Sequence, residues 1–472
     1  MADRWAEQAG RVGADLHLEL DGGGSRRAAL IRALRAAVSE GRLRPGQRLP
    51  PYRSLAADLG LTRNTVASAY AELVAEGWLT ARQGSGTRVA ARSVSPVQAP
   101  VAPPARRTVA HDLGQGKPDA GSFPRTAWAA AARRALTAAP NDAFGPGDPH
   151  GRPELRAALA EYLGRVRGVR TDPARIVVCS GFAHALRLLF GGAGGSGRGV
   201  LRGKLAVEAY GLGFHRSLLA AASVRTVPLE VDEQGARIEE LPSGARAVLL
   251  TPAHQFPTGG PLASGRRAAA VEWARARGGL VLEDDYDGEF RYDREPVGAV
   301  QGLDPERVIY LGSVSKSLSP AVRLGWMVLP GHLVDAVIGV KGEREAWASA
   351  LDQLTLAEFI RSGQYDRHVR RMRQRYRGRR DRLVSVLASR APHVSVSGIA
   401  AGLHAVLRLP PGTEASTLVR AARAGVALDG LSAFRHPDAA ASGDGLVVGY
   451  AAPSEHAYGA ALDALCAVLP KR

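Results

Sequence analysis

Short, fully apolar runs alternate with longer helical patterns through much of this 472-residue chain. One such helical pattern covers residues 265–277 and separates runs of only three or four residues. Fully apolar strands that alternate with helices predict an α/β domain with a mostly parallel sheet, covered by helices on both faces. Ligands of such sheets bind where the strands end, so the residues after each run are the first candidates for a site. The predicted strands are 176–178, 205–207, 247–250, 280–282 and 308–311.

A single lysine stands in the serine-rich turn that follows the run 308–311. The chain has only five lysines among 62 basic residues, and Lys316 has Ser313 and Ser315 before it and Arg323 seven residues after it. A lysine amine condenses with an aldehyde as a Schiff base, while hydroxyl groups and the forked donors of arginine hold a phosphate. The set therefore suits a ligand with one aldehyde and one phosphate. On spacing alone, a solvent-exposed surface lysine explains the segment equally well.

Other strand ends carry polar residues that suit the same ligand. Ser180, Gly181 and Phe182 open a helix whose free amides suit a phosphate, although an ordinary helix cap is the commoner explanation. The stretch 283–289 places several carboxylates after the run 280–282. A buried carboxylate would keep a pyridinium nitrogen protonated, and Mg²⁺ is the alternative partner; the lysine after the next strand favours the pyridine. In the loop 251–259, His254 or Gln255 are ligand candidates, with a satisfied loop histidine as the default.

The first part of the chain has short helices and a glycine-tipped hairpin. A helical pattern begins at Arg26, and two further short helices meet at a glycine turn, with Thr62 as the cap of the second. Arg63, Asn64 and Thr65 lie at the outward start of that helix, where side chains reach phosphates and base edges in the major groove. Residues 78–80 and 87–89 flank Gln-Gly-Ser-Gly and predict a two-stranded wing. The pattern indicates a winged helix-turn-helix.

Positive charge is concentrated in the same part. The whole chain has a formal charge of +17, and residues 25–92 hold twelve arginines and four acidic residues, a net charge of +8. The local excess favours a nucleic-acid partner over the alternative, a small helical domain that docks on another protein. A second arginine-dense segment, 363–382, is predicted to be one long solvated helix rather than a second DNA-binding face.

Composition separates the chain into two domains. Residues 93–110 contain four prolines and many small residues, which predicts a tether between a DNA-binding domain over 1–92 and a second domain over 111–472. Residues 390–472 are expected to form a smaller α+β subdomain. Two distant cysteines, Cys179 and Cys466, give no disulfide framework or metal spacing. Because neither a signal peptide nor a membrane-spanning run is recognised, a cytoplasmic protein is expected.

The N-terminal part resembles the winged helix of the GntR family over residues 25–90. The resemblance rests on Leu-Arg-Pro-Gly-Gln-Arg-Leu-Pro at 43–50, Arg-Ser-Leu-Ala at 53–56, Thr-Arg-Asn-Thr-Val at 62–66 and Gly-Ser-Gly-Thr at 84–87. It implies double-stranded operator DNA as the partner. The implied DNA contacts are Arg53, Arg63, Asn64, Thr65, Gly84, Ser85 and Gly86.

The motifs at the strand ends resemble those of fold-type I aminotransferases, and the joined architecture is similar to the MocR branch of GntR regulators over residues 25–465. The resemblance implies pyridoxal 5′-phosphate (PLP) as cofactor and a homodimer. It implies that Lys316 forms the Schiff base, that Asp284 pairs with the pyridine nitrogen and that Tyr286 bonds the ring 3-hydroxyl. The implied phosphate contacts are Arg323, Ser313, Ser315 and the turn Ser180-Gly181-Phe182.

Three departures from the family pattern bear on function. Val447 stands where relatives that sense an amino acid carry an arginine, Leu212 replaces a common aromatic residue beside the ring, and Ala183 replaces a common glutamine. These changes leave PLP binding intact and weaken the case for an amino-acid effector. The sequence therefore predicts a regulator that senses PLP, as regulators of vitamin B6 synthesis do, and not an enzyme. The alternatives are an active aminotransferase and a regulator that senses an amino acid through PLP.

Overall fold

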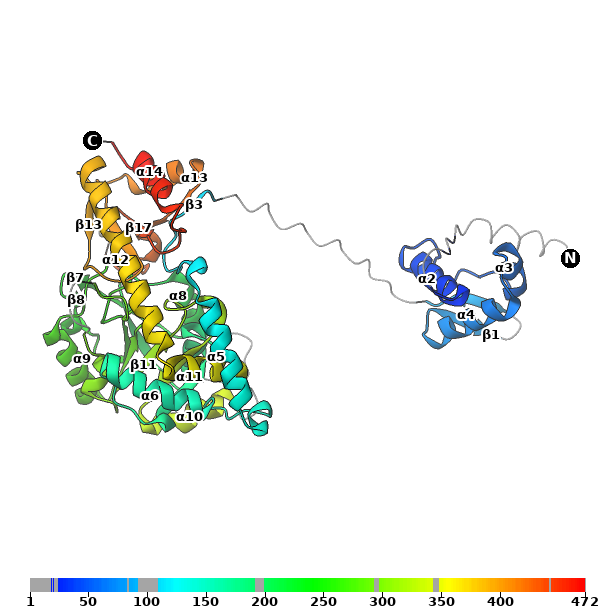
Figure 1. Ribbon diagram of the computed structural model, residues 1–472, viewed down its shortest axis with the longest axis horizontal. Helices are drawn as coiled ribbons and strands as arrows, with labels where there is room; N and C mark the ends of the chain where they lie inside the picture. The colour runs from blue at the N-terminus through cyan, green and yellow to red at the C-terminus, as the bar shows by residue number, and fades with distance from the viewer. Residues whose placement is uncertain are drawn as a thin grey trace. The chain divides into compact units, whose positions relative to one another are not determined.

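The chain divides into two compact units, Met1–Arg106 and Arg107–Arg472 (Figure 1). Each unit has its own apolar core. The computed structural model describes residues 18, 20, 24–82, 85–91, 109–191, 199–292, 297–342, 348–440 and 443–471. The predicted linker, 93–110, falls outside these residues except at its last two positions. None of the helices in the described ranges is long and apolar enough to cross a bilayer.

The first unit is a winged helix-turn-helix, as predicted. The Thr62 hydroxyl accepts a hydrogen bond from the Thr65 amide at 3.2 Å and caps the helix that the sequence pattern places there. Apolar faces of the three helices that the structure describes in this unit and of the hairpin meet in one core, which includes Leu34, Leu55 and Leu73. The elements are α2 (Arg26–Ser39), α3 (Tyr52–Asp58), α4 (Arg63–Ala75), β1 (Leu79–Arg82) and β2 (Gly86–Val89).

A seven-stranded sheet forms the centre of the described part of the second unit. Its order is β4-β12-β11-β10-β9-β5-β6. Neighbouring strands are parallel, except that β12 runs antiparallel to both β11 and β4. The strands are β4 (Ile176–Cys179), β5 (Lys204–Glu208), β6 (Thr226–Leu229), β9 (Ala245–Leu250), β10 (Leu280–Asp284), β11 (Val308–Ser313) and β12 (Gly325–Val328).

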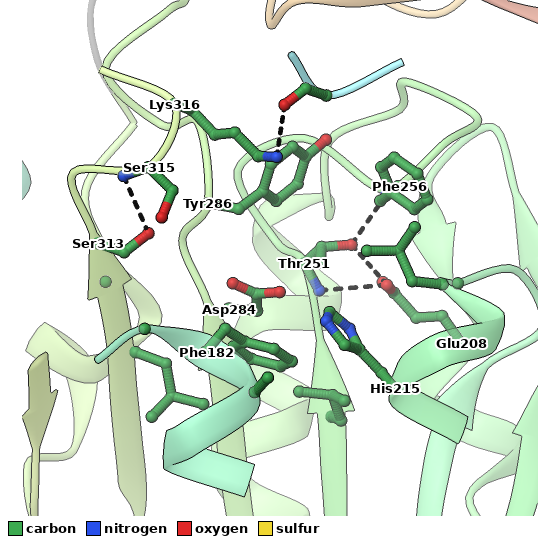
Figure 2. A pocket seen from close by; sticks show the side chains of 18 of the residues that line it. Phe182, Glu208, His215, Thr251, Phe256, Asp284, Tyr286, Ser313, Ser315 and Lys316 are labelled. Atoms are coloured by element: carbon green, nitrogen blue, oxygen red, sulfur yellow. Dashed lines mark hydrogen bonds between the residues drawn. The ribbon is translucent and has the colours of Figure 1, made fainter. Parts of the chain in front are cut away.

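The mostly parallel sheet and five of its strands are therefore confirmed, whereas β6 and β12 are not predicted. Pro228 interrupts the apolar pattern of β6, and β12 follows directly on the serine-rich turn. Because the parallel strands end at one edge of the sheet, Asp284 at the end of β10 and Ser313 at the end of β11 approach the same space (Figure 2).

Helices cover both faces of this sheet, because alternate residues along each strand point to opposite sides. One face, with Val177 and Ile309, packs against α7 (Phe182–Phe190), α8 (Gly213–Ala221) and α10 (Val334–Lys341). The opposite face, with Ile176 and Val281, packs against α6 (Pro153–Arg167), α9 (Ser264–Arg277) and α11 (Ala350–Arg361). The prediction of a doubly covered sheet is confirmed.

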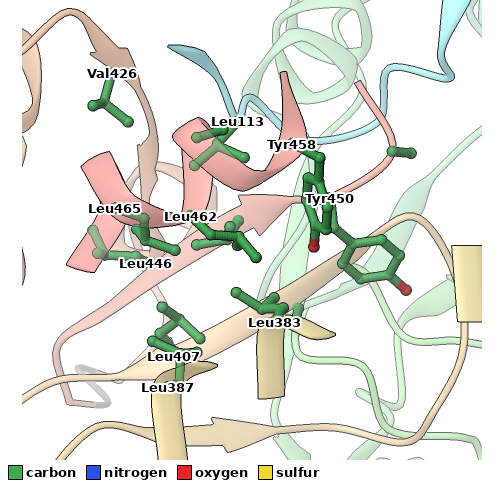
Figure 3. Packing of buried hydrophobic residues seen from close by; sticks show 14 of the residues in the cluster. Leu113, Leu383, Leu387, Leu407, Val426, Leu446, Tyr450, Tyr458, Leu462 and Leu465 are labelled. Atoms are coloured by element: carbon green, nitrogen blue, oxygen red, sulfur yellow. The ribbon is translucent and has the colours of Figure 1, made fainter. Parts of the chain in front are cut away.

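A smaller α+β layer completes the second unit, as predicted. Its antiparallel sheet has the order β13-β14-β17-β16. In Figure 3, Leu407 and Leu446 of this sheet pack with Leu462 and Leu465 of a C-terminal helix. The elements are β13 (Ser395–Ser397), β14 (His404–Arg408), α13 (Glu414–Arg423), β16 (Asp429–Gly430), β17 (Gly445–Gly449) and α14 (Tyr458–Val468).

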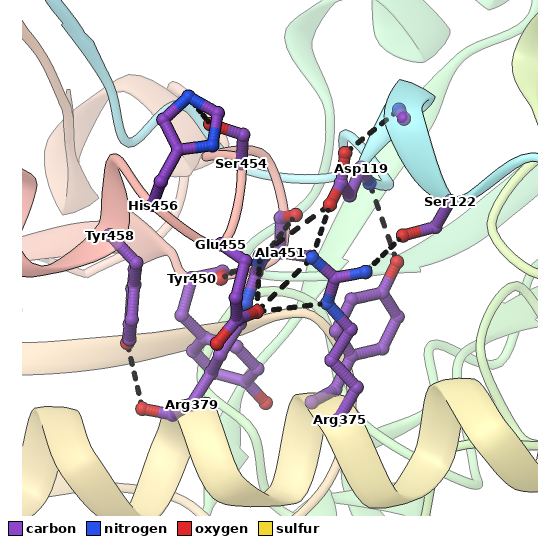
Figure 4. A network of polar contacts seen from close by, with 12 residues as sticks. Asp119, Ser122, Arg375, Arg379, Tyr450, Ala451, Ser454, Glu455, His456 and Tyr458 are labelled. Atoms are coloured by element: carbon purple, nitrogen blue, oxygen red, sulfur yellow. Dashed lines mark hydrogen bonds and ion pairs between the residues drawn. The ribbon is translucent and has the colours of Figure 1, made fainter.

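The arginine-rich segment lies in one 27-residue helix, α12 (Gln364–Arg390). Its outer face is solvated, as Arg377 shows, but the inner face is not. Arg375 pairs with Asp119 at 2.9 Å, and the buried Arg379 donates to the Ala451 carbonyl at 2.8 Å (Figure 4). The prediction of a solvated helix is wrong for this inner face, where guanidinium groups tie α12 to segments distant in sequence.

A buried ion pair fixes the chain just after β10. Arg167, the last residue of α6, donates to both oxygens of Asp285, at 2.6 and 3.0 Å, and the side chains are 3% and 2% exposed. Tyr310 of β11 donates to the same carboxylate at 2.6 Å. Burial alone would lower the pKa of the Arg167 guanidinium, but the Asp285 carboxylate more than offsets this and raises it. The pair therefore stays ionised inside the unit.

We expect Asp285→Ala to lower the free energy of unfolding of the second unit by about 3–5 kcal/mol, because it leaves a buried arginine charge without its partner. Urea unfolding followed by circular dichroism measures this change. Asp463→Ala is the matched control, since Asp463 pairs with Arg390 on the exposed surface and its loss should cost at most about 1 kcal/mol. Equal, small effects of the two substitutions would contradict the account.

Candidate functional site

A cavity of about 280 Å³ lies at the carboxyl ends of the central strands. Figure 2 shows side chains from several elements converging on it. Of the residues predicted to hold a cofactor, those that line the cavity are Lys316, Asp284, Tyr286, Arg323, Ser313, Ser315, Gly181 and Phe182. Ser180 does not line it; its amide donates to Nδ1 of His184 at 3.1 Å. The fold thus brings together residues from three separate strand ends.

The Lys316 amine lies inside the cavity. Its Nζ donates to the Gly116 carbonyl at 2.6 Å. Gly116 has a φ of +71°, and a Cβ there would lie 3.0 Å from Nζ, so glycine leaves room for the amine. Burial lowers the pKa of Lys316, and the carboxylates of Asp287 and Asp284 offset this only in part. A lowered pKa leaves more of the amine unprotonated and nucleophilic.

The Asp284 carboxyl group faces the cavity from the end of β10. Burial, followed by the charges of Asp285 and Asp287, raises its pKa well above the ordinary value. Within the described ranges Asp284 forms no ion pair, whereas the neighbouring Glu283 accepts two backbone amides, each at 2.9 Å. A cationic ligand atom beside Asp284 would compensate its charge. The Mg²⁺ alternative is not supported, since the described residues contain no group of three side chains placed to hold a metal ion.

The Tyr286 hydroxyl contacts a buried histidine outside the cavity lining. The oxygen lies 2.9 Å from Nδ1 of His254, and the same Nδ1 lies 2.9 Å from a carboxylate oxygen of Asp287. His254 and Gln255 are buried, and neither lines the cavity. The hypothesis that one of them points at a ligand is therefore not supported, and the default of a satisfied loop histidine describes His254.

Donors for an anion gather at another side of the cavity. Gly181 has a φ of +114° and directly precedes α7, so the first amides of this helix open toward the cavity. Ser313 and Ser315 follow β11, with the Ser315 amide 3.4 Å from the Ser313 hydroxyl. Arg323 has a φ of +56°, a conformation that is uncommon outside glycine and often occurs at functional sites. Amides, hydroxyls and a guanidinium form a donor set that suits a phosphate.

Glu208 and His215 also line the cavity, and neither is predicted from the sequence. Glu208 ends β5, and burial raises its pKa to about 7 although it accepts a hydrogen bond from the Thr251 hydroxyl at 2.5 Å. Its position at the end of a strand could have identified Glu208 as a candidate from the sequence. The ring of His215 lies 4.6 Å from that of Phe182, and burial lowers the pKa of His215 to about 4. No sequence signal marks His215, because it lies within a helix.

The departures noted in the sequence create an apolar side to the cavity. Val447 in β17 is fully buried in a cluster with Tyr210 and Phe256, both of which line the cavity. Leu212 also lines it, in the place expected for an aromatic residue. Arg216 is a lining cation, but its guanidinium already donates to three backbone carbonyls at 2.7 to 3.2 Å. Position 447 therefore offers no anchor for a carboxylate.

The residues predicted to contact DNA lie on the surface of the first unit. The side chains of Arg53, Arg63 and Asn64 are exposed, Thr65 is half-buried beneath the helix cap, and Gly86 is exposed in the hairpin. Ser85 is half-buried and donates to the Arg82 carbonyl at 3.4 Å. Gly84 lies outside the described residues.

Comparisons with known proteins assign both units. Residues 26–89 match the family described as "Bacterial regulatory proteins, gntR family", and residues 110–439 match "Aminotransferase class I and II". The solved structure of Pyrococcus horikoshii kynurenine aminotransferase has a TM-score of 0.67 at 24% identity and covers 76% of this chain and 90% of that chain. LysN, an α-aminoadipate aminotransferase from Thermus thermophilus, has a TM-score of 0.66 at 24% identity, covering 76% and 91%. These structures confirm the aminotransferase fold.

Regulators match over most of their length. The probable rhizopine catabolism regulatory protein MocR of Rhizobium meliloti is 34% identical over 450 residues, which cover 89% of each chain. The pyridoxine biosynthesis transcriptional regulator PdxR of Corynebacterium glutamicum is 33% identical over 382 residues, which cover 80% of this chain and 82% of that protein. The chain therefore belongs to the MocR-type, GntR-family helix-turn-helix transcriptional regulators that carry an aminotransferase class I domain.

Proposed function

We propose that this regulator binds PLP in the cavity of its second unit and operator DNA through its winged helix, as a cytoplasmic homodimer, with PLP as the signal. The observation that carries the proposal is the convergence of Lys316, Asp284 and a phosphate-type donor set on one cavity. Similarity to a regulator named for pyridoxine biosynthesis supports the further proposal that this protein controls vitamin B6 synthesis.

The residues present fit PLP group by group. PLP, when bound, supplies an aldehyde that bonds to an amine and a pyridine ring that takes up electrons. In our proposal, Lys316 provides the amine, Asp284 holds the proton at the ring nitrogen and the Tyr286 hydroxyl bonds the ring 3-oxygen. The phosphate contacts that we propose are Arg323, Ser313, Ser315 and the amides of Gly181 and Phe182, with Ser180 supporting their turn.

The apolar side of the cavity favours a sensor over an enzyme that converts amino acids. A substrate carboxylate needs a paired arginine or several hydrogen bonds once it is removed from water. Val447 provides neither, and the donors of Arg216 are engaged with the backbone. We therefore propose that the cavity reports PLP itself and that the domain does not transaminate.

We expect Arg63→Ala to weaken operator binding by about 1–3 kcal/mol, because it removes a cation at the exposed start of α4. Fluorescence anisotropy at a fixed salt concentration measures the dissociation constant. Arg133→Ala, which removes an equal charge from the exposed surface of the second unit, is the control and should bind DNA like the wild type. Equal losses in the two variants would speak against a specific contact from α4.

We expect PLP to change the operator affinity of the wild-type protein by roughly 5- to 150-fold, the usual range of coupling between two sites. Lys316→Ala should abolish this response, because it removes the amine that holds the aldehyde. The same binding assay, run with and without PLP, tests the proposal.

The control for this experiment is Lys204→Ala, which removes a lysine from the exposed start of β5, outside the cavity lining. It should keep the full response to PLP. DNA affinity that PLP does not change in the wild type would overturn the proposal, and turnover of an amino acid with a keto acid would favour the aminotransferase alternative.

A further inference from the structure

A buried histidine and aspartate stand behind Tyr286 without a role in the proposed function. His254 comes from the loop after β9, and Asp287 follows β10 by three residues. Their side chains are 3% and 1% exposed. Nδ1 of His254 lies 2.9 Å from both the Tyr286 hydroxyl and Oδ2 of Asp287. Tyr286 lines the cavity with Lys316 (Figure 2). The histidine and aspartate are therefore one contact away from the cavity.

The hydrogen-bonding roles of the imidazole, the carboxylate and the phenol determine where their protons lie. A carboxylate only accepts hydrogen bonds, so Nδ1 of His254 carries a proton and donates it to Asp287. The other carboxylate oxygen, Oδ1, has no partner among the described residues, which leaves the histidine N–H as the compensating contact. Since Nδ1 is then a donor, it cannot accept the proton of the Tyr286 hydroxyl. The phenol O–H has two acceptors to choose between, the Asp287 carboxylate, with which Tyr286 shares a hydrogen bond, and an acceptor in the cavity. The N–H of His254 already compensates that carboxylate, which favours donation of the phenol O–H into the cavity.

The surrounding structure is shaped to hold this arrangement. Gly402 has a φ of +72°, and a Cβ there would lie 2.4 Å from Cε1 of His254 and 2.5 Å from Oδ2 of Asp287. The ring of His404 packs 5.2 Å from that of His254 and bonds the Pro257 carbonyl through Nε2 at 3.1 Å. Burial lowers the pKa of His404 to about 3, so this ring is neutral and does not compensate the Asp287 charge.

The other charged groups around Tyr286 favour its protonated form. Burial, followed by the carboxylates of Asp287, Asp284 and Glu208, holds the pKa of the Tyr286 hydroxyl well above its ordinary value. Tyr286 is therefore a neutral phenol with one proton to donate. The surrounding residues can therefore affect only the direction in which the Tyr286 O–H points.

We propose that His254 and Asp287 are positioning residues that direct the Tyr286 O–H at the ring 3-oxygen of PLP, and so set the pH at which the Lys316–PLP linkage exchanges its proton. The inference rests on the proposed binding of PLP at Lys316. A hydrogen bond donated to the 3-oxygen stabilises its anion and lowers the affinity of the adjacent linkage nitrogen for a proton. Loss of that hydrogen bond therefore raises the pH at which half of the linkage nitrogen is protonated.

The test is a pH titration of the visible absorbance of the full-length protein with bound PLP. Tyr286→Phe removes the donor, and His254→Phe removes both ring nitrogens while it keeps a ring against Gly402. Each should raise the midpoint by roughly half to one pH unit, the scale of one hydrogen bond. The double variant should show no further shift, because His254 acts only through Tyr286.

Two further variants keep the inference testable. Asp287→Asn removes the carboxylate that holds the proton on Nδ1. Because the lost charge alone would lower the pKa at Lys316, a raised midpoint in this variant reports the redirected Tyr286 O–H, even if His254→Phe fails to fold. His393→Phe is the matched control, because the His393 ring contacts the Pro470 carbonyl far from the cavity. This variant should leave the midpoint unchanged.

An unchanged midpoint in Asp287→Asn, or additive shifts in the double variant, would overturn the role of the pair and leave PLP binding standing. A visible PLP absorbance that is the same in Lys316→Ala as in the wild type would instead overturn the proposed function, and the inference with it.

Discussion

Carboxyl groups buried just after β10 are the constraint on which the site depends. A carboxylate is unfavourable inside a protein unless a cation or several hydrogen bonds compensate it. Glu283 has two backbone amides, Asp285 has Arg167, and Asp287 has His254. Among the described residues Asp284 has no such partner and opens to the cavity. The structure therefore leaves the Asp284 carboxyl group open to the cavity, whereas its three acidic neighbours contact other protein groups.

The same chain also carries a DNA-binding unit of the GntR family. Because the two units have separate cores, occupancy of the cavity influences DNA binding only if the DNA-bound and free forms of the regulator differ in affinity for the ligand. In our proposal the aminotransferase fold suits this use, because its cavity places the Lys316 amine where it can bond the PLP aldehyde. Val447, buried in an apolar cluster with Tyr210 and Phe256, offers no partner for a carboxylate.

Much of the fold was predictable because its signals are local. Apolar runs marked five strands, a threonine cap marked α4, and the strand-end rule pointed to Lys316 and Asp284. The remainder depends on contacts between distant segments. Nothing local shows that Arg379 is buried, or that the ring of His215 packs against that of Phe182 beside the cavity. The sequence also does not show which of the adjacent acidic residues is paired and which faces the cavity, because their partners come from other elements.

The central claim is that PLP is bonded to Lys316 in this cavity. The most direct measurement is borohydride reduction of the PLP-loaded protein, followed by proteolysis and mass spectrometry of the peptides. The account predicts the added mass on the peptide that contains Lys316. A label on the buried Lys341, on the surface Lys117 or Lys204, or on no peptide would contradict it.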